Sequence, residues 1–265
     1  KWEWLDNCLG GGFLEAGKAL YVFAGETNIG KSIFLGNIAS NIAEEGKNVL
    51  LVTLEMSELL YARRICSNVT KIPMKELAQN SASIKHGMSN EDGKIFIKEF
   101  PPATITANQL KAFVKKFEEQ GIKLDAIVLD YLNLMHSTVG NNSYERIKHV
   151  TEQVRAMSYL FNCPIISATQ LNRAGFDTDN PDLATISESI GLAATADAII
   201  SIFQNEEERG IGIIRLGMMK NRYGPRGNTQ AMRIDYSTLT IEQADDIEIG
   251  EDMDDTLNVL AGLAQ

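Results

Sequence analysis

The glycine-rich segment 25–32 reads GETNIGKS and fits the pattern G-x-x-x-x-G-K-[ST] at every position. In loops of this kind, backbone N–H groups and the start of the next helix converge on phosphate oxygens, and the helix dipole adds partial positive charge. The lysine of the pattern reaches the β- and γ-phosphates, and the serine hydroxyl binds Mg²⁺. We therefore predict a nucleoside triphosphate site with Mg²⁺ rather than a plain turn that contains glycines. Its eight residues are Gly25, Glu26, Thr27, Asn28, Ile29, Gly30, Lys31 and Ser32.

Two acidic residues each end an apolar run downstream of this loop. Asp130 follows the apolar residues 126–129, and Glu55 ends the segment 48–55, which reads NVLLVTLE. A carboxylate at the carboxyl end of a buried strand can hold Mg²⁺ beside a phosphate loop, so we predict that Asp130 serves the metal. The alternative is an aspartate that merely ends a strand.

Many ATPases with such a loop place a catalytic glutamate directly after this aspartate, whereas Tyr131 stands here. We predict that Glu55 polarises the attacking water instead, because neighbouring parallel strands end in the same crevice. The alternative for Glu55 is an acid that stabilises the amino end of the helix expected from Ser57. No [NT]-K-x-D guanine signature occurs, which favours ATP over GTP.

Three further polar residues also stand where strands end. Gln170 closes an apolar run, and a neutral amide there can sense the γ-phosphate. Lys220 and Arg222 follow another apolar run and precede a turn at 223–228. A fork of hydrogen-bond donors on an exposed turn can stabilise the negative charge of phosphoryl transfer in a neighbouring subunit. The alternative is that the two residues are solvated surface cations.

Apolar runs alternate with helical patterns around these residues, which predicts an α/β fold: a mostly parallel twisted sheet with helices on both faces and an antiparallel end. We expect segment 1–12 to be a flexible entry and segment 73–100 to form short helices and loops. A helix is expected over 108–119, and another follows the exposed loop 136–143. The expected strands span 20–24, 48–55, 104–106, 125–135, 163–171, 198–203, 211–219 and 231–236.

The bulk composition fits one large core. The chain has 265 residues, of which 44% are apolar, and no apolar run approaches the ~20 residues of a membrane span. Cys8, Cys66 and Cys163 are widely spaced and indicate reduced thiols, so we expect a cytoplasmic protein without a membrane partner.

The net charge of −10 is concentrated near the carboxyl terminus, where eight acids and no base lie between 242 and 255. These acids account for eight of the ten net negative charges, so the remainder is close to neutral. This charge distribution permits a polyanionic partner. We predict that residues 242–265 form a separate acidic tail.

The motifs together resemble the RecA-type motor domain of DnaB-family replicative helicases, especially the phage members. The resemblance rests on five stretches in order: GETNIGKS, LLVTLEMSE with Glu55, AIVLDYLNLM with Asp130, IISATQLNR with Gln170, and MMKNRYGPRG with Lys220 and Arg222. It covers residues 4–241, so we expect an ATPase domain over residues 1–241 with a RecA-like P-loop NTPase core.

The resemblance implies a ring, typically a hexamer, that translocates 5′ to 3′ on single-stranded DNA by hydrolysing ATP with Mg²⁺. It implies that Lys31 and Ser32 contact phosphate and metal, that Glu55 is the catalytic carboxylate, and that Asp130 serves the metal. It further implies that Gln170 is the γ-phosphate sensor and that Lys220 and Arg222 act in a neighbouring subunit. A looser analogy puts Arg64 near the nucleotide and Tyr236 against adenine.

The chain departs from the family pattern in the second DNA-facing loop. Family members commonly carry R-E-S-G there, whereas this chain has SESI at 187–190 and lacks the basic contact. DNA contact is then expected from backbone amides or from other cations near the two loops, and exposed surface charge is the alternative. The candidates are Arg146, Lys148, Arg173, Glu188 and Ser189.

The collar domain and linker helix that lock such rings are not found in the sequence, so this chain alone is expected to associate weakly. Two other functions stay open. One is a recombinase that forms filaments on DNA, and the other is an ATP-gated assembly factor with little hydrolysis. Segment 256–263 suits docking onto a primase or another replication protein, although a disordered end is the default. In a phage-encoded protein the cytoplasm would be that of the host.

Overall fold

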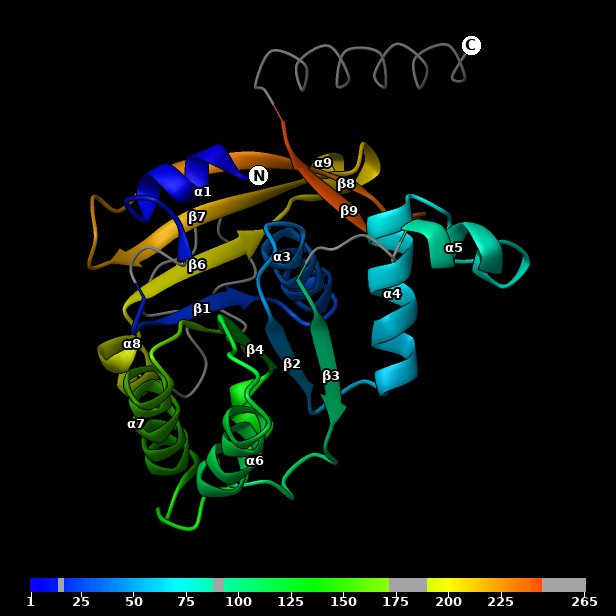
Figure 1. The fold of residues 1–265 in the computed structure, drawn as a ribbon. Coiled ribbons are helices and arrows are strands. Elements are labelled where there is room, and N and C mark those ends of the chain that lie inside the picture. Colours follow the sequence, from blue (N-terminus) through cyan, green and yellow to red (C-terminus); the bar gives the residue numbers. More distant parts are fainter. Residues whose placement is uncertain (14–16, 88–92, 172–189, 245–265) are drawn as a thin grey trace.

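The computed structural model describes residues 1–13, 17–87, 93–171 and 190–244, and all structural statements concern these ranges. Their strands form one sheet in the order β3-β2-β4-β5-β1-β6-β7-β8-β9 (Figure 1). The strands are β1 (Leu20–Gly25), β2 (Val49–Thr53), β3 (Ile95–Glu99), β4 (Ala126–Asp130), β5 (Ile165–Gln170), β6 (Ala198–Phe203), β7 (Ile213–Asn221), β8 (Thr229–Asp235) and β9 (Thr240–Gln243).

The first six strands in this order run parallel, and β7, β8 and β9 continue the sheet in antiparallel pairs. All residues of β1, β2 and β4 are buried, because helices cover both faces of the sheet. The predicted fold class, a mostly parallel sheet with helices on both faces and an antiparallel end, is confirmed.

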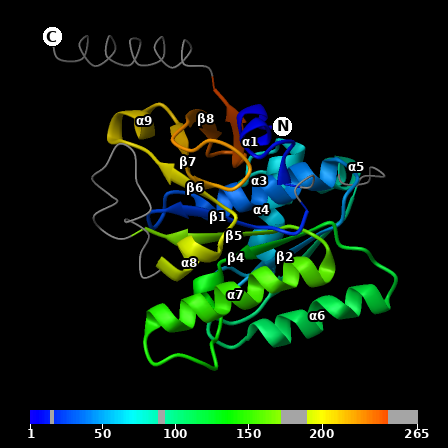
Figure 2. The same cartoon turned by 90° about the vertical axis from the view of Figure 1, so that its left-hand side faces the viewer.

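Helices flank the sheet in two layers. One layer contains α1 (Glu3–Cys8), α3 (Lys31–Glu44) and α4 (Glu58–Thr70), and the other contains α6 (Ala107–Glu119), α7 (Ser143–Phe161) and α8 (Ile190–Thr195). Figure 2 shows α6 and α7 on the opposite side of the sheet from α1 and α3. The shorter elements are η1 (Leu77–Gln79), α5 (Ser81–Gly87), η2 (Leu132–Leu134) and α9 (Glu206–Gly210).

Side chains of β1 alternate between the two cores, as the pleat of a strand requires. Tyr21 and Phe23 belong to the core under α3, and Leu20, Val22 and Ala24 belong to the core under α7. The register places Gly25 beside Gln170. The carboxyl ends of β1, β4 and β5 therefore meet along one edge of the sheet.

The amino-terminal segment is not the flexible entry that we expected. Residues Glu3–Cys8 form α1, and Trp2 and Leu5 are buried in the core of the α3 face. The Trp2 indole also donates a hydrogen bond to the carbonyl oxygen of Ile241, 3.1 Å away in β9. These contacts fasten the first residues to the last strand.

Several expected strands differ from the structure. Segment 104–106 is not a strand, because Thr106 caps α6 and forms a capping box with Gln109. Segment 73–100 contains β3, an edge strand whose apolar run, 95–97, is short and only half-buried. The expected strand 125–135 ends at Asp130 and continues as η2, and β9 includes Glu242, which we had assigned to the tail.

Two expectations from composition can be compared with the structure directly. Cys8, Cys66 and Cys163 are free thiols. None of the helices in the described ranges has both the length and the apolarity to cross a membrane.

Candidate functional site

The glycine-rich loop connects the end of β1 to the start of α3. Gly30 is the residue that caps α3, and its φ of 103° lies in the left-handed region that favours glycine. At Gly25 a Cβ atom would lie 2.8 Å from Ile29 Cγ2 and 3.1 Å from the Ile202 carbonyl oxygen, which is too close. The two glycines therefore allow the tight turn that brings the loop backbone and the helix start together.

Lys31 is the first residue of α3, and its side chain folds back over the loop. Its ammonium donates hydrogen bonds to the carbonyl oxygens of Gly25, at 3.1 Å, and Glu26. Burial lowers the pKa of Lys31, and the nearby carboxylates of Glu55, Asp130 and Glu26 partly offset this. The cation thus lies among acidic groups at the carboxyl edge of the sheet.

Asp130 ends β4 and is 1% exposed. Its Oδ2 accepts a hydrogen bond of 2.8 Å from the hydroxyl of Tyr61, whereas Oδ1 accepts none from the described residues. Burial raises the pKa of Asp130, and the hydroxyls of Ser32 and Tyr61 only partly offset it. A buried carboxylate oxygen without a donor is what a hard cation such as Mg²⁺ binds.

Glu55 follows β2 and is exposed. The chain beside it is fixed, because the backbone N–H of Leu54 donates to the carbonyl oxygen of Asp130 at 2.7 Å. The charge of Glu55 contributes to the pKa values of Lys31 and Asp130, so the structure brings these three residues together.

Gln170 ends β5 and touches the glycine-rich loop. Its Nε2 donates a hydrogen bond of 2.6 Å to the hydroxyl of Thr27. An amide in this position contacts the loop and directly precedes the segment after β5, of which residues 172–189 lie outside the described ranges.

Lys220 and Arg222 lie at the opposite edge of the sheet, where the parallel strands begin. The Lys220 ammonium donates to carbonyl oxygens at and beyond the end of α8, and Arg222 donates to Asp197, which directly precedes β6. Asp197 in turn accepts from the backbone N–H of Leu20, the first residue of β1. β1 has six residues, so its two ends lie roughly 20 Å apart. Within one chain, these cations and the glycine-rich loop do not share a site.

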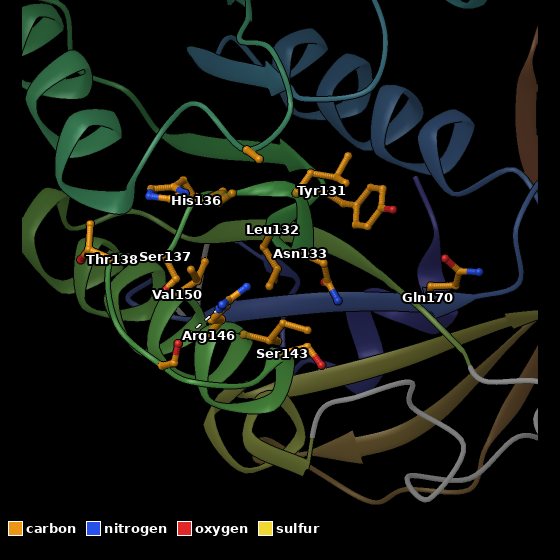
Figure 3. A pocket seen from close by; sticks show the side chains of 15 residues that line it. Tyr131, Leu132, Asn133, His136, Ser137, Thr138, Ser143, Arg146, Val150 and Gln170 are labelled. Carbon is orange, nitrogen blue, oxygen red and sulfur yellow. Dashed lines mark hydrogen bonds between the residues drawn. The ribbon is translucent and has the colours of Figure 1, made fainter.

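A cleft of about 970 Å³ extends from Gln170 along η2 and the loop 136–143 to the amino end of α7. Figure 3 shows polar side chains along its walls, with Arg146 projecting from α7 and Asn133 closer to Gln170. Arg146 Nε donates to the Gly140 carbonyl oxygen at 3.3 Å.

Of the other predicted DNA contacts, Lys148 is exposed on α7 and approaches Gly191 of α8. Arg173, Glu188 and Ser189 lie outside the described residues. The cleft beside Arg146 and the exposed Lys148 are therefore the parts of the predicted DNA-binding region that the structure describes.

Arg64, predicted near the nucleotide, and Tyr236, predicted against adenine, lie on α4 and in the turn between β8 and β9. Arg64 is half-exposed on α4 and lines a small cavity with Ser32 and Leu239. Tyr236 is 52% exposed in the turn between β8 and β9, three residues before Leu239. The cavity thus joins Arg64 to the start of α3 and to the turn that carries Tyr236.

Sequence reasoning missed Tyr61, and it also missed Arg155 of α7 and Asp197, which form a salt bridge of 2.9 Å. Tyr61 is fully buried on α4, and burial raises its pKa well above the usual value. Its contact with Asp130 joins residues 69 positions apart in the chain. No local pattern signals such a contact, because it depends on how α4 packs against β4.

The model of the family described as the DnaB-like helicase C terminal domain matches residues 1–239 of the chain. The DnaB-like replicative helicase of Enterobacteria phage T4 is 25% identical over 228 residues, which cover 81% of this chain and 48% of that protein. A probable replicative DNA helicase of Trieres chinensis is 29% identical over 233 residues, which cover 80% of this chain and 50% of that protein. The chain therefore spans about half the length of the curated relatives it matches.

Two solved structures share the fold. One, described as an ATPase domain, gives a TM-score of 0.79 at 19% sequence identity and covers 92% of this chain and 90% of that one. A DnaB-like replicative helicase, solved in a study of its interactions with primase, also gives 0.79 at 18% identity and covers 92% of this chain and 62% of that one. We expected a RecA-like core from the resemblance. These two structures confirm that the chain has the fold of DnaB-like ATPase domains.

Proposed function

Because the chain belongs to the DnaB-like replicative helicase family, we propose that it is the ATP-hydrolysing motor domain of a hexameric DNA helicase. In this proposal the ring moves 5′ to 3′ along single-stranded DNA, as the resemblance in sequence implies. The observation that carries the proposal is the position of Lys31, Glu55 and Asp130 at one edge of the sheet, where the glycine-rich loop ends β1.

The phosphate groups of ATP would lie against the loop. Its backbone N–H groups and the amino end of α3 face anions favourably, and Lys31 adds a positive charge. The Ser32 hydroxyl and Oδ1 of Asp130, which has no donor among the described residues, would hold Mg²⁺, the latter directly or through water. A bound Mg²⁺ would neutralise phosphate charge and stabilise the ionised form of Asp130, whose pKa burial otherwise raises.

Water activation falls to Glu55 in this proposal. Glu55 is exposed, lies near Lys31 and Asp130, and stands at the end of β2 next to β4. Gln170 would report the state of the nucleotide, because its side chain already contacts Thr27 in the loop. We also retain Arg64 and Tyr236 as residues that approach the nucleotide from α4 and from the β8–β9 turn.

Lys220 and Arg222 would serve the nucleotide of a neighbouring subunit. Their location at the opposite edge of the sheet from the loop supports a role in trans, since neither reaches the loop of its own chain. In a ring, each interface can join the loop edge of one subunit to the cation edge of the next.

Single-stranded DNA would pass along the cleft that contains Arg146. The cleft begins at Gln170, so a DNA contact there would lie next to the nucleotide sensor. Lys148, Arg173, Glu188 and Ser189 remain candidate contacts. A solved relative was studied with primase, and we propose a primase or another replication protein as a partner.

The experiment that tests this function is the rate of ATP hydrolysis by the assembled full-length protein, with and without single-stranded DNA. We expect DNA to stimulate the wild type, and we expect Glu55→Gln to lower the stimulated rate by about 10²- to 10⁴-fold, because a general base is lost. Nucleotide affinity should change little.

An unstimulated, low rate that Glu55→Gln leaves unchanged would instead support an ATP-gated assembly factor. Electron microscopy on DNA provides an independent check. Closed rings are expected, and open filaments would favour a recombinase.

A further inference from the structure

Asp197 is a buried carboxylate that two arginines share. The residue is 3% exposed and directly precedes β6. Its Oδ1 accepts hydrogen bonds from Arg155 Nη2, at 2.9 Å, and from Arg222 Nη1, at 2.6 Å. Its Oδ2 accepts from Arg155 Nε and from the backbone N–H of Leu20, both at 2.9 Å. Both oxygens are therefore fully used.

The carboxyl group of Asp197 is ionised at neutral pH. Burial acts to raise its pKa, but the hydrogen bonds from Arg155 and the Leu20 backbone and the charges of Arg155 and Arg222 together lower it below the usual value. One negative charge thus faces two positive ones, and either arginine alone suffices to balance it.

The two arginines bind this carboxylate differently. Arg155 uses two nitrogens as a fork, and its guanidinium also lies 5.3 Å from the centre of the Tyr159 ring. Arg222 reaches the carboxylate through Nη1 alone, and its side chain is 44% exposed compared with 27% for Arg155. Arg155 is therefore the fixed counter-ion, and Arg222 is the more accessible of the pair.

The backbone of the same segment is fixed as well. The N–H of Arg222 donates to the carbonyl oxygen of Asp197 at 3.1 Å. Two residues earlier, the Lys220 ammonium donates to the carbonyl oxygens of Ala193, at 2.6 Å, and Ala196, at 2.6 Å. The segment that carries both cations is thus attached to the chain around α8 and β6 at several points.

We propose that Asp197 is a positioning residue for the trans site, and that it fixes the direction of the Arg222 guanidinium with Arg155 as its permanent counter-ion. The proposal rests on the proposed function, because Arg222 must act on a neighbour's nucleotide for its direction to matter. An exposed arginine loses rotamer freedom when it binds phosphate, and an arginine held in place beforehand loses less. If the contact is made mainly in the transition state, this difference appears in kcat rather than in KM.

The test is a double-mutant cycle in the assembled full-length protein, with kcat and KM measured for DNA-stimulated ATP hydrolysis. Asp197→Asn keeps an oxygen for the Leu20 N–H and removes the charge that holds Arg222. We expect kcat to fall about 10- to 100-fold while KM changes little, since small misplacements of a catalytic group have effects of this size. In an Arg222→Ala background, Asp197→Asn should cause no further loss.

A matched control is Glu208→Gln, which removes another buried carboxylate paired with an arginine, Arg215. It should lower stability without a selective fall in kcat. Arg155→Lys is a second test variant in case Asp197→Asn does not fold: it keeps the charge but removes the fork. Its loss of kcat should also vanish when Arg222 is absent.

Three results would overturn the inference. If Asp197→Asn lowered kcat equally with and without Arg222, the role of Asp197 would be structural only. A rise in kcat would mean that Asp197 competes with the nucleotide for Arg222. If Arg222→Ala itself left kcat unchanged, the trans role in the proposed function would fail, and the positioning role would fail with it.

Discussion

At the carboxyl ends of the parallel strands, buried Asp130 keeps one oxygen without a donor among the described residues, whereas at their amino ends buried Asp197 receives four hydrogen bonds. Burial leaves the pKa of Asp130 raised, but two arginines and a backbone N–H leave that of Asp197 lowered. Both carboxylates begin from the same chemistry and differ only in their neighbours.

The difference indicates what each end is for. A buried acceptor without a donor among the described residues suits a ligand from outside, which we propose to be Mg²⁺ with a nucleotide. A fully satisfied carboxylate instead orders the groups that surround it, here Arg155 and Arg222. In the function we propose, the first end supplies the phosphate and metal site and the second end supplies the cations, so a complete site needs two copies of the domain.

The largest expected effect comes from removing Arg222, the cation at the amino ends of the parallel strands. Arg222→Ala should lower DNA-stimulated ATP hydrolysis by about 10³-fold or more, because a trans-acting arginine stabilises charge that develops in the transition state. Nucleotide affinity should stay nearly unchanged, which equilibrium binding of a fluorescent ATP analogue would measure.

The matched control is Arg226→Ala, which removes an exposed arginine from the same turn. Its rate should remain close to that of the wild type. Equal losses from the two variants would mean that general surface charge matters rather than the particular position of Arg222.

A smaller effect on hydrolysis is expected from a substitution at the carboxyl ends of the parallel strands. Tyr61→Phe leaves Asp130 Oδ2 without its 2.8 Å donor. Partners that orient a metal ligand typically contribute about 10- to 100-fold to metal affinity, so the Mg²⁺ concentration for half-maximal hydrolysis should rise within this range. Tyr144→Phe removes a hydroxyl from an exposed tyrosine and should change nothing. If Tyr61→Phe left the Mg²⁺ requirement unchanged, Asp130 would not be a ligand of the metal.

The groups at the carboxyl ends of the parallel strands were largely predictable from sequence, whereas at the amino ends only Lys220 and Arg222 were predicted. Gly25, Asp130 and Gln170 each close an apolar run, and parallel strands bring such ends together whatever the details of packing. Tyr61 at the carboxyl ends, and Arg155 and Asp197 at the amino ends, were not predicted, because their contacts join residues 69, 42 and 177 positions apart in the sequence. No periodicity encodes these contacts.

Errors in the predicted helices and strands, by contrast, have local causes. The T-x-x-Q spacing of Thr106 and Gln109 signals a helix cap, and in the structure this cap forms where a short strand was predicted. Edge strand β3 is half-buried, so its pattern is weaker than that of the central strands. The apolar residues after Asp130 extended the predicted strand, but in the structure they form η2.

The most direct test of the composite site mixes two inactive proteins. One carries Lys31→Ala and the other Arg222→Ala, and the two are co-assembled in equal amounts before DNA-stimulated ATP hydrolysis is measured. In a head-to-tail ring, about a quarter of the interfaces then join an intact Lys31 to an intact Arg222 from the next subunit. Recovery of hydrolysis well above that of either variant alone is predicted. A mixture that remains as inactive as its components would contradict a nucleotide site shared between subunits.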